Sequence, residues 1–234
     1  MSTPPRSAPT RAFRALIGED RWRALTARGR PKTLPGSSLL LGQGDRESRL
    51  YALESGRVRV VYTGVEGTET FIAIRGPGDL IGEYAQRDAG GRTASVWTLE
   101  ACEVTVVSFG AFGSFIKEAR LENELQRYMM AKTRQNPQRI HLAANRSMEQ
   151  RLAQLLLEVV YAGVGPTASQ VHLSQRQIGD ALGVTRPWVN RALRKWRVEG
   201  FIRTRPDPIT VLDIEALKRR APQDATCSTS PPGK

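Results

Sequence analysis

The stretch that most constrains the fold is residues 173–193, LSQRQIGDALGVTRPWVNRAL, which has the pattern of two short helices around a tight turn. Apolar side chains at helical spacing lie on both sides of Gly183; they are Ile178, Ala181 and Leu182 before it and Val189, Ala192 and Leu193 after it. Gly183 suits the turn because glycine takes a positive φ at little steric cost. The pattern predicts a helix-turn-helix, whose second helix enters the major groove of DNA.

Charge separates this prediction from an ordinary helical hairpin with a solvated face. Such a face usually mixes charges of both signs. Residues 185–205 instead carry a single acid, Glu199, against seven cations, which are Arg186, Arg191, Arg194, Lys195, Arg197, Arg203 and Arg205. A surface of one sign beside this motif indicates phosphate contacts and therefore favours DNA binding.

Composition excludes several other classes of protein. The length of 234 residues favours one or two domains, and the net charge is +12. The two cysteines, Cys102 and Cys227, provide neither a disulfide framework nor a cluster for zinc, haem or iron–sulfur, and a reducing cytoplasm fits them. The two histidines, His141 and His172, lie outside the predicted strands, so a metal oxygenase barrel and other enzyme sites are not expected. No apolar run reaches the roughly 18 residues of a membrane span.

The first half of the chain predicts a β domain. Residues 11–30 have a helical apolar stripe, and residues 1–10 are expected to form a disordered arm. Six β-prone runs then alternate with Gly and Pro turns between Leu34 and Phe109, which is typical of a sandwich or barrel; the runs are SSLLL, RLYALE, RVRVVY, TETFIAIR, TASVWTLE and EVTVVSF. In residues 57–61 arginines alternate with valines, so the arginines are expected on a wet face.

The second half predicts mainly helix. Residues 110–146 are helical, with a kink or break expected at Asn136–Pro137 because proline inside a helix removes a hydrogen bond and clashes. Ser147 to Gln150 matches a capping box, so a new helix is expected from Met148 to about Tyr161. After the helix-turn-helix, FIRTR and ITVL predict paired strands, Asp213 caps a last helix, and residues 222–234 form a loose tail. A hairpin after a helix-turn-helix makes a winged helix.

A second group of chemistry-bearing residues lies in RGPGDLIGEYAQRDAGGRTA, residues 75–94. The backbone of this Gly-flanked loop could form an anion nest, with Arg92 pairing a phosphate and Glu83 accepting from a sugar hydroxyl. A surface loop with a Glu83–Arg92 ion pair fits the same residues. Spacing alone leaves both interpretations open.

Over roughly residues 12–220 the chain resembles the Crp/Fnr family of bacterial transcription regulators. The resemblance rests on GQGD (42–45), LESGRV (53–58), GPGDLIGE (76–83), GRTA (91–94), ACEV (101–104) and the helix-turn-helix segment 173–202. It implies an α+β fold with an N-terminal β jelly-roll barrel, a long dimerisation helix and a C-terminal winged helix-turn-helix. The corresponding boundaries are 11–110 for a cyclic-nucleotide-binding-like sensor barrel, 111–146 for the dimerisation helix and hinge, and 147–221 for the DNA-binding domain.

The resemblance also implies an effector site. By position, Glu83 would meet a ribose hydroxyl, Arg92 a cyclic phosphate, and Gly82, Thr93 and Ala94 would lie around it. The dimer helix departs from the family pattern, because Asn136–Pro137 stands where nucleotide-responsive members offer a polar pair to the purine. A cyclic nucleotide (cAMP, cGMP or a cyclic dinucleotide), another anion and no ligand at all therefore stay open.

For DNA, the resemblance assigns base reading to Arg186 and Arg191, since arginine pairs bidentately with guanine. Asn190 would reach an adenine or a phosphate, and Pro187 replaces a position that often reads cytosine, so the operator should differ. Contacts to the DNA backbone are expected from Ser174, Gln175, Thr185, Trp188, Arg194, Lys195, Arg203 and Arg205. Either Thr185 or Arg186 could cap the second helix.

The implied partners are a palindromic double-stranded DNA site, a second copy of the chain and RNA polymerase, with no membrane, metal, haem or iron–sulfur cluster. Two alternatives differ from an effector-controlled regulator. One is an effector-independent regulator with a degenerate barrel, and the other is a cyclic-nucleotide signalling module that binds no DNA. The sequence leaves open whether such a protein activates or represses, and on which genes.

Overall fold

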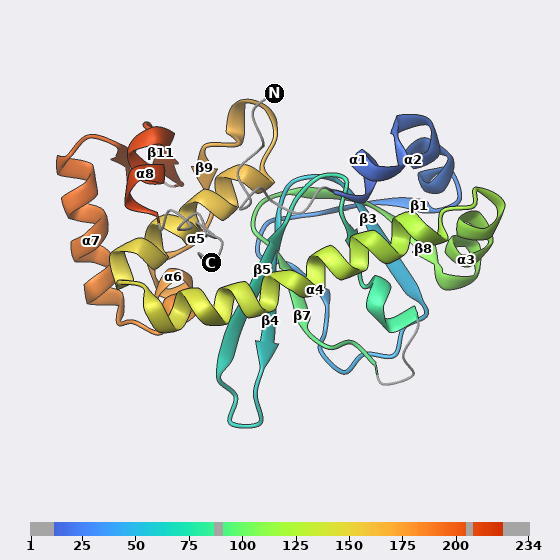
Figure 1. Ribbon diagram of the computed structural model, residues 1–234, viewed down its shortest axis with the longest axis horizontal. Helices are drawn as coiled ribbons and strands as arrows, with labels where there is room; N and C mark the ends of the chain where they lie inside the picture. Colours follow the sequence, from blue (N-terminus) through green and yellow to red (C-terminus); the bar gives the residue numbers. More distant parts are fainter. Residues whose placement is uncertain (1–11, 87–90, 205–207, 222–234) are drawn as a thin grey trace, which may run out of the picture.

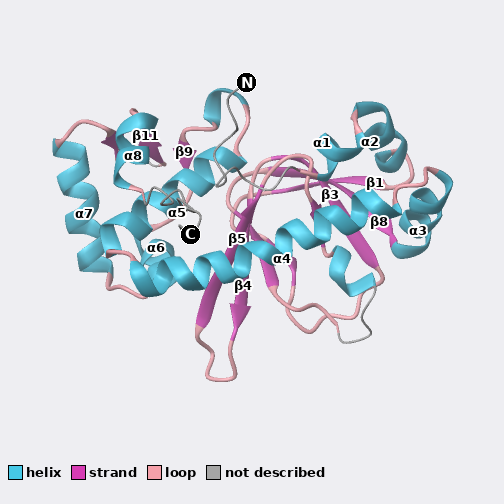
Figure 2. Ribbon diagram, in the orientation of Figure 1, coloured by secondary structure: helices cyan, strands magenta, loops and turns pink. Residues whose placement is uncertain are grey.

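The computed structural model describes residues 12–86, 91–204 and 208–221, with the backbone alone for residues 135–145. A β-rich domain and a mostly helical domain lie at opposite ends of the molecule, and one long helix, α4, runs between them (Figure 1). The strands of the β-rich domain lie in the middle of the view beside α4, and the short strands β9 and β11 lie among the helices of the other domain (Figure 2). In the parts of the chain described, no helix is long and apolar enough to cross a membrane.

The first domain is built from two four-stranded antiparallel sheets, with strand orders β1-β8-β3-β6 and β2-β7-β4-β5. All six predicted runs form strands. They are β2 (Leu39–Leu41), β3 (Arg49–Ser55), β4 (Val58–Thr63), β5 (Glu69–Arg75), β7 (Ser95–Thr98) and β8 (Cys102–Ser108). Two strands were not expected, β1 (Arg30–Leu34) and β6 (Leu80–Ile81). The expected jelly-roll-like β domain is thus present, with Leu53, Val58 and Val104 buried between the sheets.

Residues 11–30 are helical over most of their length, as the apolar stripe predicts. The segment forms two short helices, α1 (Phe13–Ile17) and α2 (Glu19–Thr26), and then enters β1 at Arg30. The break falls at Gly18, whose φ of 85° is not helical. Most of the predicted stripe is nonetheless buried, because Phe13 packs against Phe112 and Tyr128 at the end of the barrel.

Of the kink or break expected at Asn136–Pro137, the break is wrong and the kink stays a prediction. After α3 (Phe109–Glu118), helix α4 runs without interruption from Glu122 to Asn145. Proline removes one backbone donor, and the remaining turns of this 24-residue helix keep their own hydrogen bonds on both sides. The chain leaves helical geometry only at Arg146, where φ is −124° and ψ is 145°, before α5 (Met148–Ala162) begins.

The second domain has the predicted winged-helix elements. Capping boxes at Ser147 and Ser174 start α5 and α6 (Gln175–Leu182), and Gly183 takes the left-handed conformation expected of it before α7 (Arg186–Val198). Strand β10 (Ile202–Arg203) pairs with β11 (Ile209–Val211), and Asp213 caps α8 (Ile214–Arg220) as expected. A third strand that was not expected, β9 (Gln170–Val171), completes this sheet. Short 3₁₀ turns lie at η1 (Glu83–Gln86) and η2 (Gly165–Thr167).

Candidate functional site

The second helix of the helix-turn-helix, α7, has one buried and one exposed face. Val189, Ala192, Leu193 and Trp196 are buried in the core of the domain. Thr185 is the N-cap, although its side chain accepts no capping hydrogen bond, and Arg186 is the first helical residue. Of the two caps left open by the sequence, the structure therefore has Thr185.

The exposed face carries the predicted DNA-contacting side chains. Arg186, Asn190 and Arg191, the candidate base readers, are all exposed on α7, which lies at the far end of the molecule from α3 (Figure 1). The candidate backbone contacts that are also exposed are Ser174, Thr185, Arg194, Lys195 and Arg203. Gln175 is partly buried, and its Oε1 has no hydrogen-bond partner. Arg205 lies outside the described residues.

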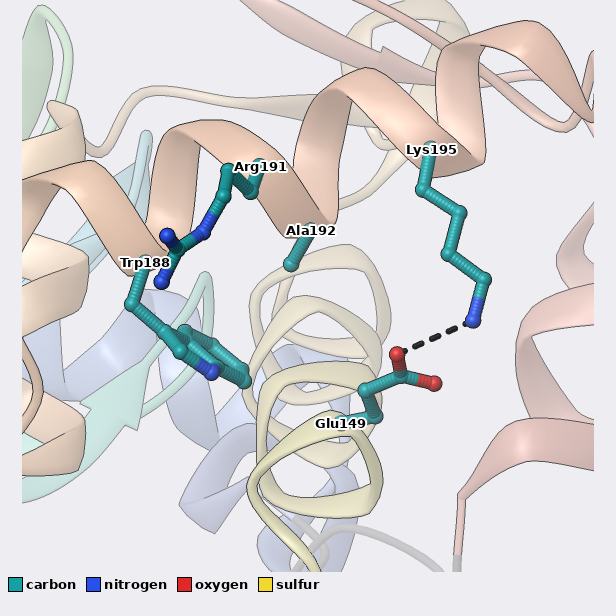
Figure 3. A pocket seen from close by; sticks show the side chains of 5 residues that line it. All are labelled: Glu149, Trp188, Arg191, Ala192 and Lys195. Carbon is teal, nitrogen blue, oxygen red and sulfur yellow. Dashed lines mark hydrogen bonds and ion pairs between the residues drawn. The ribbon is translucent and has the colours of Figure 1, made fainter.

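A shallow pocket separates α7 from the first turn of α5. Trp188 and Arg191 lie on one side of it, and an ion pair between Lys195 and Glu149 lies on the other (Figure 3). The Lys195 Nζ to Glu149 Oε1 distance is 3.0 Å, and both side chains are about half exposed. Such pairs contribute less than about 1 kcal/mol, so Lys195 can exchange the carboxylate for a phosphate. Trp188 is half-buried against the core of the domain.

The candidate effector site lies where Gly82 and η1 follow β6. Arg92 is almost fully buried, and its guanidinium donates to three main-chain carbonyls, those of Gly82 (2.6 Å), Glu47 (3.0 Å) and Arg49. Its Nε is buried without a partner, and burial lowers the pKa of Arg92. A buried guanidinium with a spare donor is suited to an anion such as a phosphate. Thr93 is exposed and Ala94 partly buried beside it.

Glu83 is held by a residue that sequence reasoning missed. Lys132 Nζ, from α4, lies 2.7 Å from Glu83 Oε1 and donates to the Leu80 carbonyl at 2.7 Å; both side chains are at most 5% exposed. Burial lowers the pKa of Lys132. The alternative interpretation of this segment, a surface loop with a Glu83–Arg92 ion pair, is therefore wrong, because both side chains are buried and Glu83 pairs with Lys132. A sugar hydroxyl would have to share or displace this ammonium.

Tyr128 ties α4 to the same loop one turn earlier. Its hydroxyl donates to Asp79 Oδ1 at 2.9 Å and accepts from the Leu80 amide at 2.9 Å. Lys132 follows Tyr128 by four residues, so the two side chains share a helix face. The sequence signal for this contact face is the helical spacing of Leu121, Leu125 and Tyr128, which Lys132 continues by one turn.

Arg57 is the second residue that sequence reasoning missed. The expectation of a wet face is wrong here, because Arg57 is 1% exposed and pairs bidentately with Glu100, at 2.7 Å from both Nε and Nη2. Its Nη1 donates to the carbonyls of Val159 and Ala168 in the second domain. Arg57 comes just before β4, where the alternation of the strand does not yet apply.

The described residues contain no group of three His, Cys, Asp or Glu side chains placed to hold an ion. The fold and the two sites together define a DNA-binding regulator, in which a sensor-type β barrel is joined by a long helix to a winged helix-turn-helix.

Comparisons with known proteins agree with that class. The family model described as a cyclic nucleotide-binding domain matches residues 31–119, and the Crp-like helix-turn-helix domain matches residues 150–220. The chain belongs to the Crp/Fnr family of transcription regulators.

Relatives with described functions cover most of the chain. The CRP-like cAMP-activated global transcriptional regulator of Mycobacterium tuberculosis is 28% identical over 203 residues, covering 85% of this chain and 91% of the relative. The cyclic AMP receptor protein of Thermus thermophilus is 28% identical over 188 residues, covering 80% and 86%. The solved structure of FixK2 from Bradyrhizobium japonicum has the same fold, with a TM-score of 0.70 at 18% identity, covering 84% of this chain and 99% of that one.

Proposed function

We propose that this regulator binds a palindromic operator as a homodimer and reads bases with Arg186, Asn190 and Arg191. The observation that carries the proposal is the exposed basic face of α7, opposite its buried apolar face. Arginine at two exposed positions of a major-groove helix favours guanine. Arg194, Lys195, Arg203 and Arg205 supply phosphate contacts, which fix register without reading sequence. Pro187 offers no acceptor to a base, so the operator differs from those read by members with glutamate there.

The test compares Arg191→Ala with Arg194→Ala on a duplex selected by the wild-type chain from a random-sequence pool and on a random duplex. Arg191→Ala should lose about 1–3 kcal/mol of binding free energy for the selected duplex and none for the random duplex, because a base contact discriminates sequence. Arg194→Ala should weaken binding to both duplexes alike, because the arginine that it removes neutralises a phosphate. The slope of log affinity against log salt concentration should fall by about one. Unchanged discrimination in Arg191→Ala contradicts the assignment of base readers.

For the effector we propose a cyclic nucleotide in the barrel, with its phosphate at Arg92 and its ribose at Glu83. The unpartnered buried Nε of Arg92 and the close approach of Gly82, where a Cβ would lie 2.6 Å from Arg92 Nη1, support an anion site there. The M. tuberculosis relative is named as cAMP-activated, and a structural neighbour from Xanthomonas campestris is named as c-di-GMP responsive. Both ligands are cyclic nucleotides, so the two proteins share a class of effector but differ in which cyclic nucleotide each responds to.

A second candidate, an effector-independent regulator, is favoured by the Lys132–Glu83 pair, which already satisfies the carboxylate that a ribose needs. Calorimetric titration with cAMP, cGMP and cyclic di-GMP, repeated on Arg92→Ala, distinguishes the two candidates. Heat that disappears in Arg92→Ala supports the effector site, and heat that survives contradicts the role of Arg92. No heat with any of the three supports effector independence. With DNA as its partner, we place the protein in the bacterial cytoplasm, where RNA polymerase is a further expected partner.

A further inference from the structure

The covalent link between the barrel and the DNA-binding domain is short and does not by itself fix their orientation. Helix α4 ends at Asn145 and α5 begins at Met148, so Arg146 and Ser147 alone separate the two helices. Both residues have extended backbone, with ψ of 145° and 155°. Two non-helical residues can act as a hinge, so contacts away from this link must hold α5 against the barrel.

Such contacts are concentrated at the other end of α5. The last four carbonyls of a helix have no partner within the helix. One of them, that of Val159, accepts from Arg57 Nη1 at 3.0 Å, and the same nitrogen donates to Ala168, just after η2, at 3.2 Å. Arg57 therefore caps the C-terminus of α5 from the barrel, where the helix dipole also favours a cation.

Neighbouring backbone comes unusually close at the same place. A Cβ added to Gly76, between β5 and β6, would lie 1.9 Å from the carbonyl oxygen of Ala162, the last residue of α5. A Cβ on Gly163 would lie 2.8 Å from Ala168 and 3.1 Å from Arg57 Nη1. Around these contacts Ile74 and Leu99 of the barrel join the apolar core of the winged helix. The interface therefore has a defined geometry rather than a loose contact.

The guanidinium is preorganised by the barrel itself. Glu100 accepts from Arg57 Nε and Nη2 and comes from the turn between β7 and β8. The backbone of this turn contacts the turn between β3 and β4, which contains Gly56 and Arg57. The Leu99 amide donates to the Arg57 carbonyl at 2.8 Å, and a Cβ on Gly56 would lie 2.4 Å from the Ala101 carbonyl oxygen. Of the bonds that the Arg57 side chain makes, undocking of α5 would break the two from Nη1 and leave the pair with Glu100 intact.

We propose that Arg57, held by Glu100, is a positioning residue for DNA recognition, which caps α5 and fixes the orientation of the winged helix on the barrel. A bidentate guanidinium fixes direction as well as distance, which an apolar contact does not. Through this contact a change in the barrel at the β7–β8 turn would reach α7 without passing along α4. The claim that Arg57 fixes the orientation of the winged helix does not depend on the DNA sequence that the protein binds.

Pulsed electron–electron double resonance, which measures distances between two spin labels, tests the proposal on the full chain without DNA. Spin labels are placed at Leu39→Cys in the barrel and Val198→Cys at the end of α7, both exposed, in a Cys227→Ser background, with buried Cys102 left in place. Labelled chain is diluted into an excess of unlabelled chain so that distances within one copy dominate. The wild type should give one narrow distance distribution.

Arg57→Met should broaden and shift this distribution. Arg57→Lys should broaden it less, because lysine keeps a cation beside Glu100 but lacks the planar fork that bonds the carboxylate bidentately. Arg59→Met is the matched control. Arg59 lies two residues further on, in β4, and its Nη1 is 3.5 Å from Glu69 Oε2 of β5 in the same domain, so its loss should leave the distribution unchanged. A folded Arg57→Met with the wild-type distribution overturns the proposal.

Gly76→Ala approaches the same contact from the other side and keeps the proposal testable if Arg57→Met does not fold. Its methyl group should push the end of α5 away while the Arg57–Glu100 pair stays in place, and the distribution should shift as in Arg57→Met. An unshifted distribution in Gly76→Ala also overturns the proposal. On DNA, the ratio of affinities for selected and random duplexes should fall about fivefold or more in Arg57→Met and stay constant in Arg59→Met.

Discussion

At the scale of single residues, two cations are buried in the described part of the chain although the sequence pattern placed one at the surface and gave no role to the other. Lys132 and Arg57 are each at most 5% exposed, and each has a carboxylate partner together with main-chain carbonyls. Burying a charge costs several kcal/mol unless pairing and hydrogen bonds compensate. Both side chains meet that condition by contacting elements distant in sequence, so each links parts of the fold rather than stabilising one strand or helix.

Lys132→Met should lower the free energy of unfolding by about 3–5 kcal/mol, because it leaves the Glu83 carboxylate buried and uncompensated. The double variant Lys132→Met/Glu83→Gln should recover part of this loss, since the remaining amide carries no charge. Urea denaturation of both variants measures the effect. Lys117→Met, on the exposed side of α3, is the control and should change the free energy by at most about 0.5 kcal/mol. A Lys132→Met midpoint equal to that of Lys117→Met would contradict the buried pair.

At the scale of elements, the turn of the helix-turn-helix depends on one backbone conformation. Gly183 has φ of 67° and ψ of 36°, and an added Cβ would meet nothing within 4 Å. Gly183→Ala should therefore lower the free energy of unfolding by about 1–2 kcal/mol, from backbone strain alone. Gly110, within α3, also has open space but no positive φ, so Gly110→Ala should be neutral or stabilising by up to about 1 kcal/mol. Thermal unfolding of the pair checks the sign difference, and equal losses in both would argue against the left-handed turn.

Elements with local signals were predicted correctly, and those that depend on distant partners were not. The capping box at Ser147, the Asp213 cap and the six β-prone runs between Gly and Pro turns are each read within a few residues. Strands β1, β6 and β9 were missed because they are short or polar, and pairing with a distant strand defines them. The break expected at Pro137 does not occur because the length of α4 outweighs one lost hydrogen bond.

The same rule divides the candidate sites. Exposure of Arg186, Asn190 and Arg191 follows from the helical spacing of the apolar residues between them, so the face of α7 was predictable. The effector site was predictable only as a set of positions carried by the family resemblance. Its contacts were not, because Lys132 reaches Glu83 across 49 residues and Arg92 bonds carbonyls more than 40 residues away.

At the scale of the whole molecule, the contact between the two domains includes a histidine, His172, whose side chain ordinarily titrates near neutral pH. His172 Nε2, between β9 and α6, lies 3.3 Å from Glu100 Oε2 on the same carboxylate that holds Arg57. Burial lowers the pKa of His172 below its usual 6.5, Glu100 opposes this shift, and the Arg57 cation adds to it. The neutral imidazole is therefore the form that the folded protein favours.

It follows that the domain contact should weaken in mild acid. Below about pH 6.5 the unfolded chain binds a proton at His172 that the folded chain does not, so stability falls as the pH drops from about 6.5 through the lower folded pKa and levels off beneath it. Urea midpoints of the wild type and of His172→Gln, measured from pH 7.5 to 5, separate this contribution from that of the carboxylates common to both. The wild type should lose stability faster than His172→Gln in that window, and parallel curves would show that His172 does not couple the domain contact to pH.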